Sequence, residues 1–159
     1  MKPRVYLETT IASAYHETRQ DAETVVRRNW TRRWWDESRH GYELVSSAAA
    51  MKELQRGDYP HQTLAVDFLS QVPMLAIEDV VENAVLEYLK HHLMPSDPGG
   101  DALHLAVASV HRCDFLLTWN CSHLANANKF IHIRKINERL GLFVPTLITP
   151  LELLGEDVP

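Results

Sequence analysis

The chain has 159 residues, of which 45% are hydrophobic and 23% are charged, and these values predict one globular domain, over residues 1–159, with its own core. No apolar run is long enough to span a bilayer, and residues 1–7 lack the apolar segment of a signal peptide, so a membrane partner is not expected. The formal net charge of −5 does not by itself indicate a nucleic-acid-binding surface, although a local basic stripe can bind phosphate. Cys113 and Cys121 lack the spacing of a zinc site, and a cytoplasmic location is the expectation.

Short apolar segments alternate with segments of helical periodicity along the chain. The apolar segments predict five strands, at 4–7, 43–46, 74–77, 115–118 and 144–148. The periodic segments predict a short helix capped by Thr9 and Thr10, and then helices at 21–39, 47–57, 60–70, 80–89, 101–111 and 128–140. Residues 94–100, which are rich in proline and glycine, are expected to form a loop. This alternation predicts an α/β fold with a parallel sheet covered by helices on both faces.

Asp101 stands at the start of an otherwise almost wholly apolar helix. Asp and Glu are rarely buried without a partner, so an acid at this place needs an explanation. One explanation is a first-turn Asp favoured by the helix dipole. The other is a metal-binding carboxylate at the rim of the sheet.

Other polar residues are expected at the same rim. Glu8 ends the first strand, Asn120 lies just past the fourth strand, and Glu53 lies in the helix after the second strand. In parallel α/β sheets, sites lie beyond the carboxyl ends of the strands, so these side chains are expected to converge with Asp101. Oxygen ligands in such a cluster suit Mg²⁺ or Mn²⁺, which would relieve the repulsion between the carboxylates. Taken singly, Glu8 is better explained as a solvent-facing strand end, and Glu53 as part of a solvated helix face.

The order and spacing of four segments resemble a PIN domain, and in particular the VapC-like toxins of bacterial toxin–antitoxin pairs. The segments are 5–10 (VYLETT), 45–54 (VSSAAAMKEL), 101–106 (DALHLA) and 115–120 (FLLTWN), and the resemblance covers essentially the whole chain. It implies a three-layer α/β/α PIN-like fold with about five parallel strands. It also implies a metal-dependent ribonuclease that cleaves RNA with a metal-activated water, with a small antitoxin protein as partner and a homodimer as assembly.

The resemblance implies Glu8, Glu53 and Asp101 as the metal ligands, with Asn120 at the position where many members of the family carry a fourth acid. Glu8 stands where the family usually has Asp, which adds one methylene to its reach. Asn120 keeps an oxygen but lacks the charge, so it is expected to act as an uncharged ligand or to orient a water, with weaker metal affinity. Asp97 and Asp114 are expected to be loop and turn residues.

Two other functions stay open. A degenerate PIN module would bind RNA or a protein partner without cleaving, and the Asn120 departure motivates this alternative. A flap-type DNA nuclease uses similar acidic sites, but the short chain leaves little room for handling duplex DNA.

Four residues near these acids have two readings each. Thr9 and Thr118 are placed to hydrogen-bond the site or its substrate, with Thr9 the favoured neighbour, although capping and strand propensity also explain them. His104, one turn after Asp101, is expected to be a packed or hydrogen-bonded core residue rather than a ligand. His123 is expected to be a surface residue near the mouth of the site.

The helix predicted at 21–39 carries arginines and tryptophans. Arg28 and Arg32 share a face with Arg39, and either they position RNA phosphates or they are a solvated face paired with nearby acids. The tryptophans Trp30, Trp34 and Trp35 exceed what a small core requires, so an interface with the antitoxin or a second copy is predicted for some of them, with at least one in the core.

Overall fold

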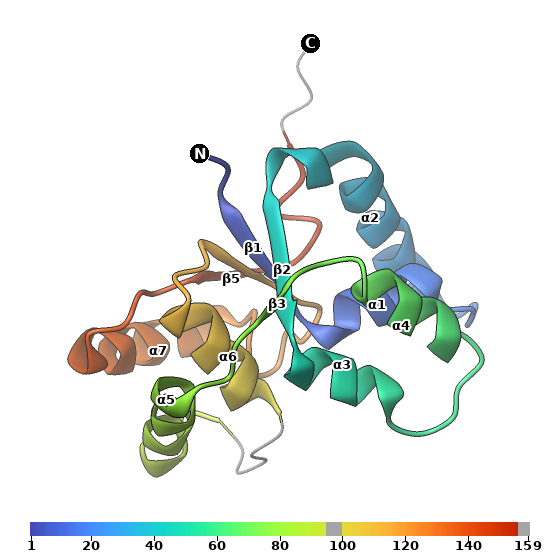
Figure 1. The fold of residues 1–159 in the computed structure, drawn as a ribbon. Helices are drawn as coiled ribbons and strands as arrows, with labels where there is room; N and C mark the ends of the chain where they lie inside the picture. Colours follow the sequence, from blue (N-terminus) through green and yellow to red (C-terminus); the bar gives the residue numbers. More distant parts are fainter. Residues whose placement is uncertain (95–99, 156–159) are drawn as a thin grey trace.

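The computed structural model describes residues 1–94 and 100–155. Its five strands form one parallel sheet in the order β3-β2-β1-β4-β5, with helices on both faces, so the predicted three-layer α/β/α arrangement is confirmed (Figure 1). The strands are β1 (Arg4–Leu7), β2 (Glu43–Ser47), β3 (Met74–Leu75), β4 (Phe115–Leu117) and β5 (Thr146–Ile148). No helix in the described ranges has the length and apolarity needed to cross a bilayer.

The helices follow the predicted periodic segments closely. They are α1 (Thr9–His16), α2 (Ala22–Ser38), α3 (Ala48–Gln55), α4 (Gln62–Leu69), α5 (Asp79–Lys90), α6 (Asp101–Val110) and α7 (Ala127–Leu140), and a short 3₁₀ helix, η1 (Arg39–Gly41), follows α2. Helices α5, α6 and α7 cover one face of the sheet, and α1, α2 and α4 cover the other (Figure 1). The expected loop at 94–100, which includes Asp97, lies almost entirely outside the described residues.

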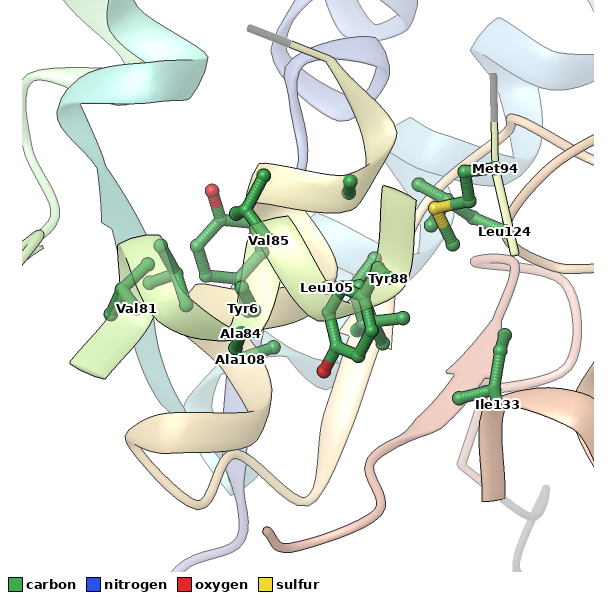
Figure 2. Packing of buried hydrophobic residues seen from close by; sticks show 14 of the residues in the cluster. Tyr6, Val81, Ala84, Val85, Tyr88, Met94, Leu105, Ala108, Leu124 and Ile133 are labelled. Carbon is green, nitrogen blue, oxygen red and sulfur yellow. The ribbon is translucent and has the colours of Figure 1, made fainter. Parts of the chain in front are cut away.

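The central strand β1 sends successive side chains to opposite faces, as the pleat of a strand requires. Tyr6 belongs to the core on the α5–α7 side, where it packs with residues such as Val81, Val85 and Leu105 (Figure 2). Its neighbours Val5 and Leu7 belong to the core on the α1–α4 side. Because β1 is buried on both faces, its sequence is a continuous apolar run that ends at Glu8.

Trp34 is fully buried in the core on the α1–α4 side. It is therefore not an interface residue, and the expectation that at least one tryptophan is core is confirmed. Trp30 and Trp35 are partly buried and pack against the same core. Val26, in the same helix, is about half exposed.

Candidate active site

The four predicted site residues lie at the edge of the sheet where the strands have their carboxyl ends. Glu8 directly follows β1, Asn120 lies three residues past β4, Asp101 is the first residue of α6, and Glu53 lies in α3, which follows β2. Burial raises the pKa of Glu8 and Asp101 most, and the Glu53 carboxylate raises both further, so Glu53 interacts through space with each of the other two acids. The structure thus brings together the acids that the sequence analysis grouped.

Glu8 is buried and both of its carboxylate oxygens accept hydrogen bonds. It is the N-cap of α1, where Oε1 accepts from the Thr10 backbone N–H at 2.6 Å, and Oε2 accepts from the Thr118 hydroxyl at 3.2 Å. Burial raises the pKa of Glu8 more than the nearby His104 and the hydrogen bonds from Thr10 lower it. The expected hydrogen bond from Thr118 to the site is therefore confirmed. The capping expectation is corrected, because the N-cap of α1 is Glu8 rather than Thr9 or Thr10. The buried Thr9 hydroxyl has no hydrogen-bond partner among the described residues.

Asp101 is held by Asn120. The Asn120 amide nitrogen donates to Asp101 Oδ1 at 2.9 Å, while its Oδ1 accepts from the backbone N–H groups of Ser122 and His123 at 3.2 and 3.0 Å. Because the Asn120 oxygen accepts these two hydrogen bonds, the NH₂ group of the amide faces Asp101 and the amide oxygen faces away from it. Asn120 therefore positions Asp101 through its N–H rather than offering an oxygen as a ligand, which differs from the expected role.

Glu53 accepts from the imidazole of His104, with 2.5 Å between its Oε1 and Nε2. Burial lowers the pKa of His104, but the Glu53 hydrogen bond and the carboxylates of Glu8, Glu53 and Asp101 raise it by more, so the net shift is upward. His104 is thus the buried, hydrogen-bonded residue that the sequence predicts, and its partner is one of the acids. His123 is half-buried, and its charge lowers the pKa of Asp101, whereas burial raises that pKa more strongly.

The carboxylates of Glu8, Glu53 and Asp101 fit a hard divalent cation in the chemistry of their donor set. They supply oxygen only, as Mg²⁺ and Mn²⁺ prefer, and burial has raised the pKa of two of them in a cluster whose repulsion a cation would relieve. As the side chains stand in the described residues, no three His, Cys, Asp or Glu groups are arranged to hold an ion. The fit is therefore one of ligand type and charge.

The arginines predicted to bind substrate have partners inside the chain. Arg28 Nη1 donates to the carbonyls of Glu17 and Arg19 at 2.8 and 3.2 Å, and Arg32 Nε donates to the Tyr15 carbonyl at 2.8 Å. Both arginines therefore fasten α2 to α1 and the segment that follows it. Their predicted contact with RNA phosphates stays a prediction.

A groove of about 280 Å³ opens beside the acidic cluster, between Thr10, Trp119 and the start of α2. Two arginines, Arg19 and Arg27, line it together with the acids Glu17, Asp21 and Glu23. Because the acids offset the arginines, the groove has no net positive charge, and it carries no assignment as a phosphate site.

Neither a comparison with models of protein families nor a search of curated proteins finds a match to this chain. The functional argument therefore depends on the fold and on the geometry of the acidic cluster.

Proposed function

We propose that this chain is a Mg²⁺- or Mn²⁺-dependent endoribonuclease of the PIN type. One observation carries the proposal: three carboxylates lie at the carboxyl edge of a parallel sheet, and each is held by a hydrogen bond from a residue at least 19 positions away in the chain. Glu8 is held by Thr118, Glu53 by His104 and Asp101 by Asn120. Bringing such charges together is costly unless a ligand repays the cost, and acidic clusters of this kind are typical of functional sites.

The residues of the chain have separable roles in this proposal. Glu8, Glu53 and Asp101 would hold the ion, which when bound supplies a polarised phosphoryl oxygen and a water of lowered pKa. Asn120 orients Asp101, and Thr118 orients Glu8. Without a cation the cluster repels the phosphates of RNA, so we expect productive RNA binding at this edge to require the ion.

The resemblance to VapC-like toxins extends the proposal to partners. We propose that a small antitoxin protein covers the site and that the chain forms a homodimer. Coexpression with the product of a neighbouring small open reading frame tests the first part, and sedimentation of the purified chain tests the second. A monomeric chain that copurifies with no such product would remove both.

Cleavage of a single-stranded RNA with Mg²⁺, with Mn²⁺ and with a chelator tests the reaction. We expect cutting with either metal and none with the chelator. Single-stranded DNA of the same sequence in the same assay separates a ribonuclease from a DNA nuclease. A folded protein that binds RNA under all conditions and never cuts it would support the binding-module alternative.

Asp101→Asn tests the site, and the chain offers a matched control. Asp101 and Asp79 are each the first residue of a helix, so both contribute to the helix dipole, but Asp79 is exposed and lies outside the cluster. We expect Asp101→Asn to abolish cutting with an unchanged circular dichroism spectrum, because the Asn carbonyl still accepts from Asn120. Asp79→Asn is expected to cut like the wild type. Cutting that persists in Asp101→Asn would place the active site elsewhere.

A further inference from the structure

A buried chain of hydrogen bonds runs from the second strand to Glu53. Ser47 Oγ lies 2.7 Å from the Tyr6 hydroxyl oxygen, which in turn lies 2.7 Å from His104 Nδ1, and His104 Nε2 contacts Glu53. Ser47 and Tyr6 are fully buried, His104 is 1% exposed, and the Glu53 side chain is 25% exposed. These hydrogen bonds thus join β2, β1, α6 and α3, and Glu53, the last residue in the series, is partly exposed.

The hydrogen bond from His104 to Glu53 is the same whether the imidazole is neutral or charged. A neutral ring that accepts from Tyr6 at Nδ1 carries its proton on Nε2, and a charged ring carries protons on both nitrogens. Tyr6 keeps its proton, because burial raises the pKa of its hydroxyl far above the ordinary value. In either state Nε2–H donates to the Glu53 carboxylate.

Glu53 needs such a partner because of its neighbours. It is near the end of α3, a helix of eight residues, and a Glu side chain loses considerable rotamer freedom when it is fixed. The charges of Glu8 and Asp101 repel it, as their pKa shifts show. An unheld Glu53 is therefore expected to turn toward solvent, away from the cluster.

We propose that His104 is a positioning residue of the active site: anchored through Tyr6 on Ser47, it holds Glu53 beside Glu8 and Asp101. This inference rests on the proposed function. Partners that orient a metal ligand from behind are worth about 10–100-fold in metal affinity. Because Tyr6 fixes the His104 ring, we expect a change at Tyr6 to lower metal affinity as well, although Tyr6 makes no hydrogen bond to a carboxylate of the site.

Tyr6→Phe and Tyr88→Phe make a matched pair for the test. Each removes a buried tyrosine hydroxyl with two side-chain partners, since Tyr88 bonds Asn137 at 2.6 Å and Ser109 at 3.4 Å in the core. The two variants are expected to lose similar thermal stability. Only Tyr6→Phe is expected to weaken Mn²⁺ binding, measured by electron paramagnetic resonance of the free ion.

His104 itself is tested by two substitutions. His104→Ala is expected to weaken Mn²⁺ binding about 10–100-fold, and His104→Gln, which keeps an N–H donor, is expected to retain more of the affinity. The second variant keeps the test decisive if His104→Ala does not fold. Wild-type affinity in a folded His104→Gln together with wild-type affinity in Tyr6→Phe would overturn the proposal.

Ring ¹⁵N resonances of His104 give a readout in the metal-free protein. We expect Glu53→Gln to shift the Nε2 signal and Tyr6→Phe to shift the Nδ1 signal, with neither shifted by Tyr88→Phe. If the wild type binds no Mn²⁺ and cuts no RNA, the proposed function fails, and the hydrogen-bonded hold on Glu53 is then decided by these signals alone. Ring signals that ignore Glu53→Gln would overturn the inference whatever the outcome for RNA.

Discussion

Replacing Asn120 by Asp puts a carboxylate where the structure has an amide donor. The new oxygen would stand about 2.9 Å from Asp101 Oδ1, the present N···O distance, and the hydrogen bond to Asp101 would be lost. The bonds from the backbone N–H groups of Ser122 and His123 would remain, since the other oxygen still accepts them. The substitution therefore changes one interaction and leaves the turn in place.

The magnitude follows from the charge on the pair. Two unit charges at this distance repel by about 6 kcal/mol at an effective dielectric constant of about 20. Taking up one proton at pH 7 costs about 4 kcal/mol for a carboxyl with an unfolded pKa near 4, so the folded pair is expected to share a proton. Because water reaches the partly exposed Asp101 and screens the pair, we expect the variant to lose about 2–4 kcal/mol of unfolding free energy at pH 7.

The pH dependence has a definite sign. The folded pair has a pKa above the unfolded value, so the folded state binds more protons, and the destabilisation grows as pH rises from about 4 toward the folded pKa. At pH 5 the expected loss is about 1.4 kcal/mol. On the proposed function, the added charge tightens the cation, so saturating Mn²⁺ raises the stability of the variant more than that of the wild type.

Urea unfolding at pH 5, 6 and 7, with and without Mn²⁺, measures these differences. Asn126→Asp is the control, because Asn126 is the N-cap of α7 and its amide donates only to the neutral carbonyls of Cys121 and Ser122. We expect its effect to depend on neither pH in this range nor Mn²⁺. If the unfolding free energy of Asn120→Asp depended on pH no more than that of Asn126→Asp, the proposed repulsion between Asp101 and the new carboxylate would be refuted.

Three further outcomes follow from burial. Trp34→Ala is expected to lose about 3–5 kcal/mol of unfolding free energy, because Trp34 is fully buried. A variant as stable in urea as the wild type would contradict the burial of Trp34. Thr118→Val is expected to lose about 1–3 kcal/mol and to raise the pKa of Glu8 further, followed by its ¹³C carboxyl shift, with an unmoved shift as the contrary result. Burial raises the pKa of the Cys113 thiol to about 12, so a thiol reagent at pH 8 should modify the exposed Cys121 and reach Cys113 only on unfolding, whereas equal rates would contradict the burial.

The fold was predictable because hydrophobic periodicity depends on local burial. The alternation of apolar and periodic segments predicts the layers and the parallel sheet, and the largest errors in strand bounds are at the edge strands. The strand predicted at 74–77 ends at Leu75, and that predicted at 144–148 begins at Thr146, after Pro145. Edge strands have one neighbour, and proline lacks the N–H of a ladder, so neither end is extended by pairing.

The acids of the site were predictable, and most of their partners were not. Glu8 follows from its place at a strand end, Asp101 from its place at a helix start and Glu53 from its place in the helix after the second strand. The direction of the Asn120 amide depends on a turn formed with Ser122 and His123. That turn has no periodic signature. His104 was predicted to be hydrogen-bonded, yet its partner is 51 residues away in the chain.

The arginines have partners that the sequence did not predict. Arg28 and Arg32 have the helical spacing of a phosphate-binding face, but spacing alone does not say whether carbonyl acceptors lie within reach. The last turn of α1 and the segment after it supply those acceptors, and their position beside α2 is a tertiary feature.

The place of β1 in the middle of the sheet has a consequence for the order of folding. Its partner β2 lies about 40 residues along the chain, but its other partner, β4, is paired with it at a separation of 110 residues, from Val5 to Phe115. Closing so long a loop is slow and comes late in sheets with distant pairings. Thr118 and Asn120 arrive with β4, so a chain that has paired only β1 with β2 leaves Glu8 hydrated and distant from Asp101. We therefore expect the electrostatic cost of the acidic cluster to arise late in folding, after β1 has paired with β2.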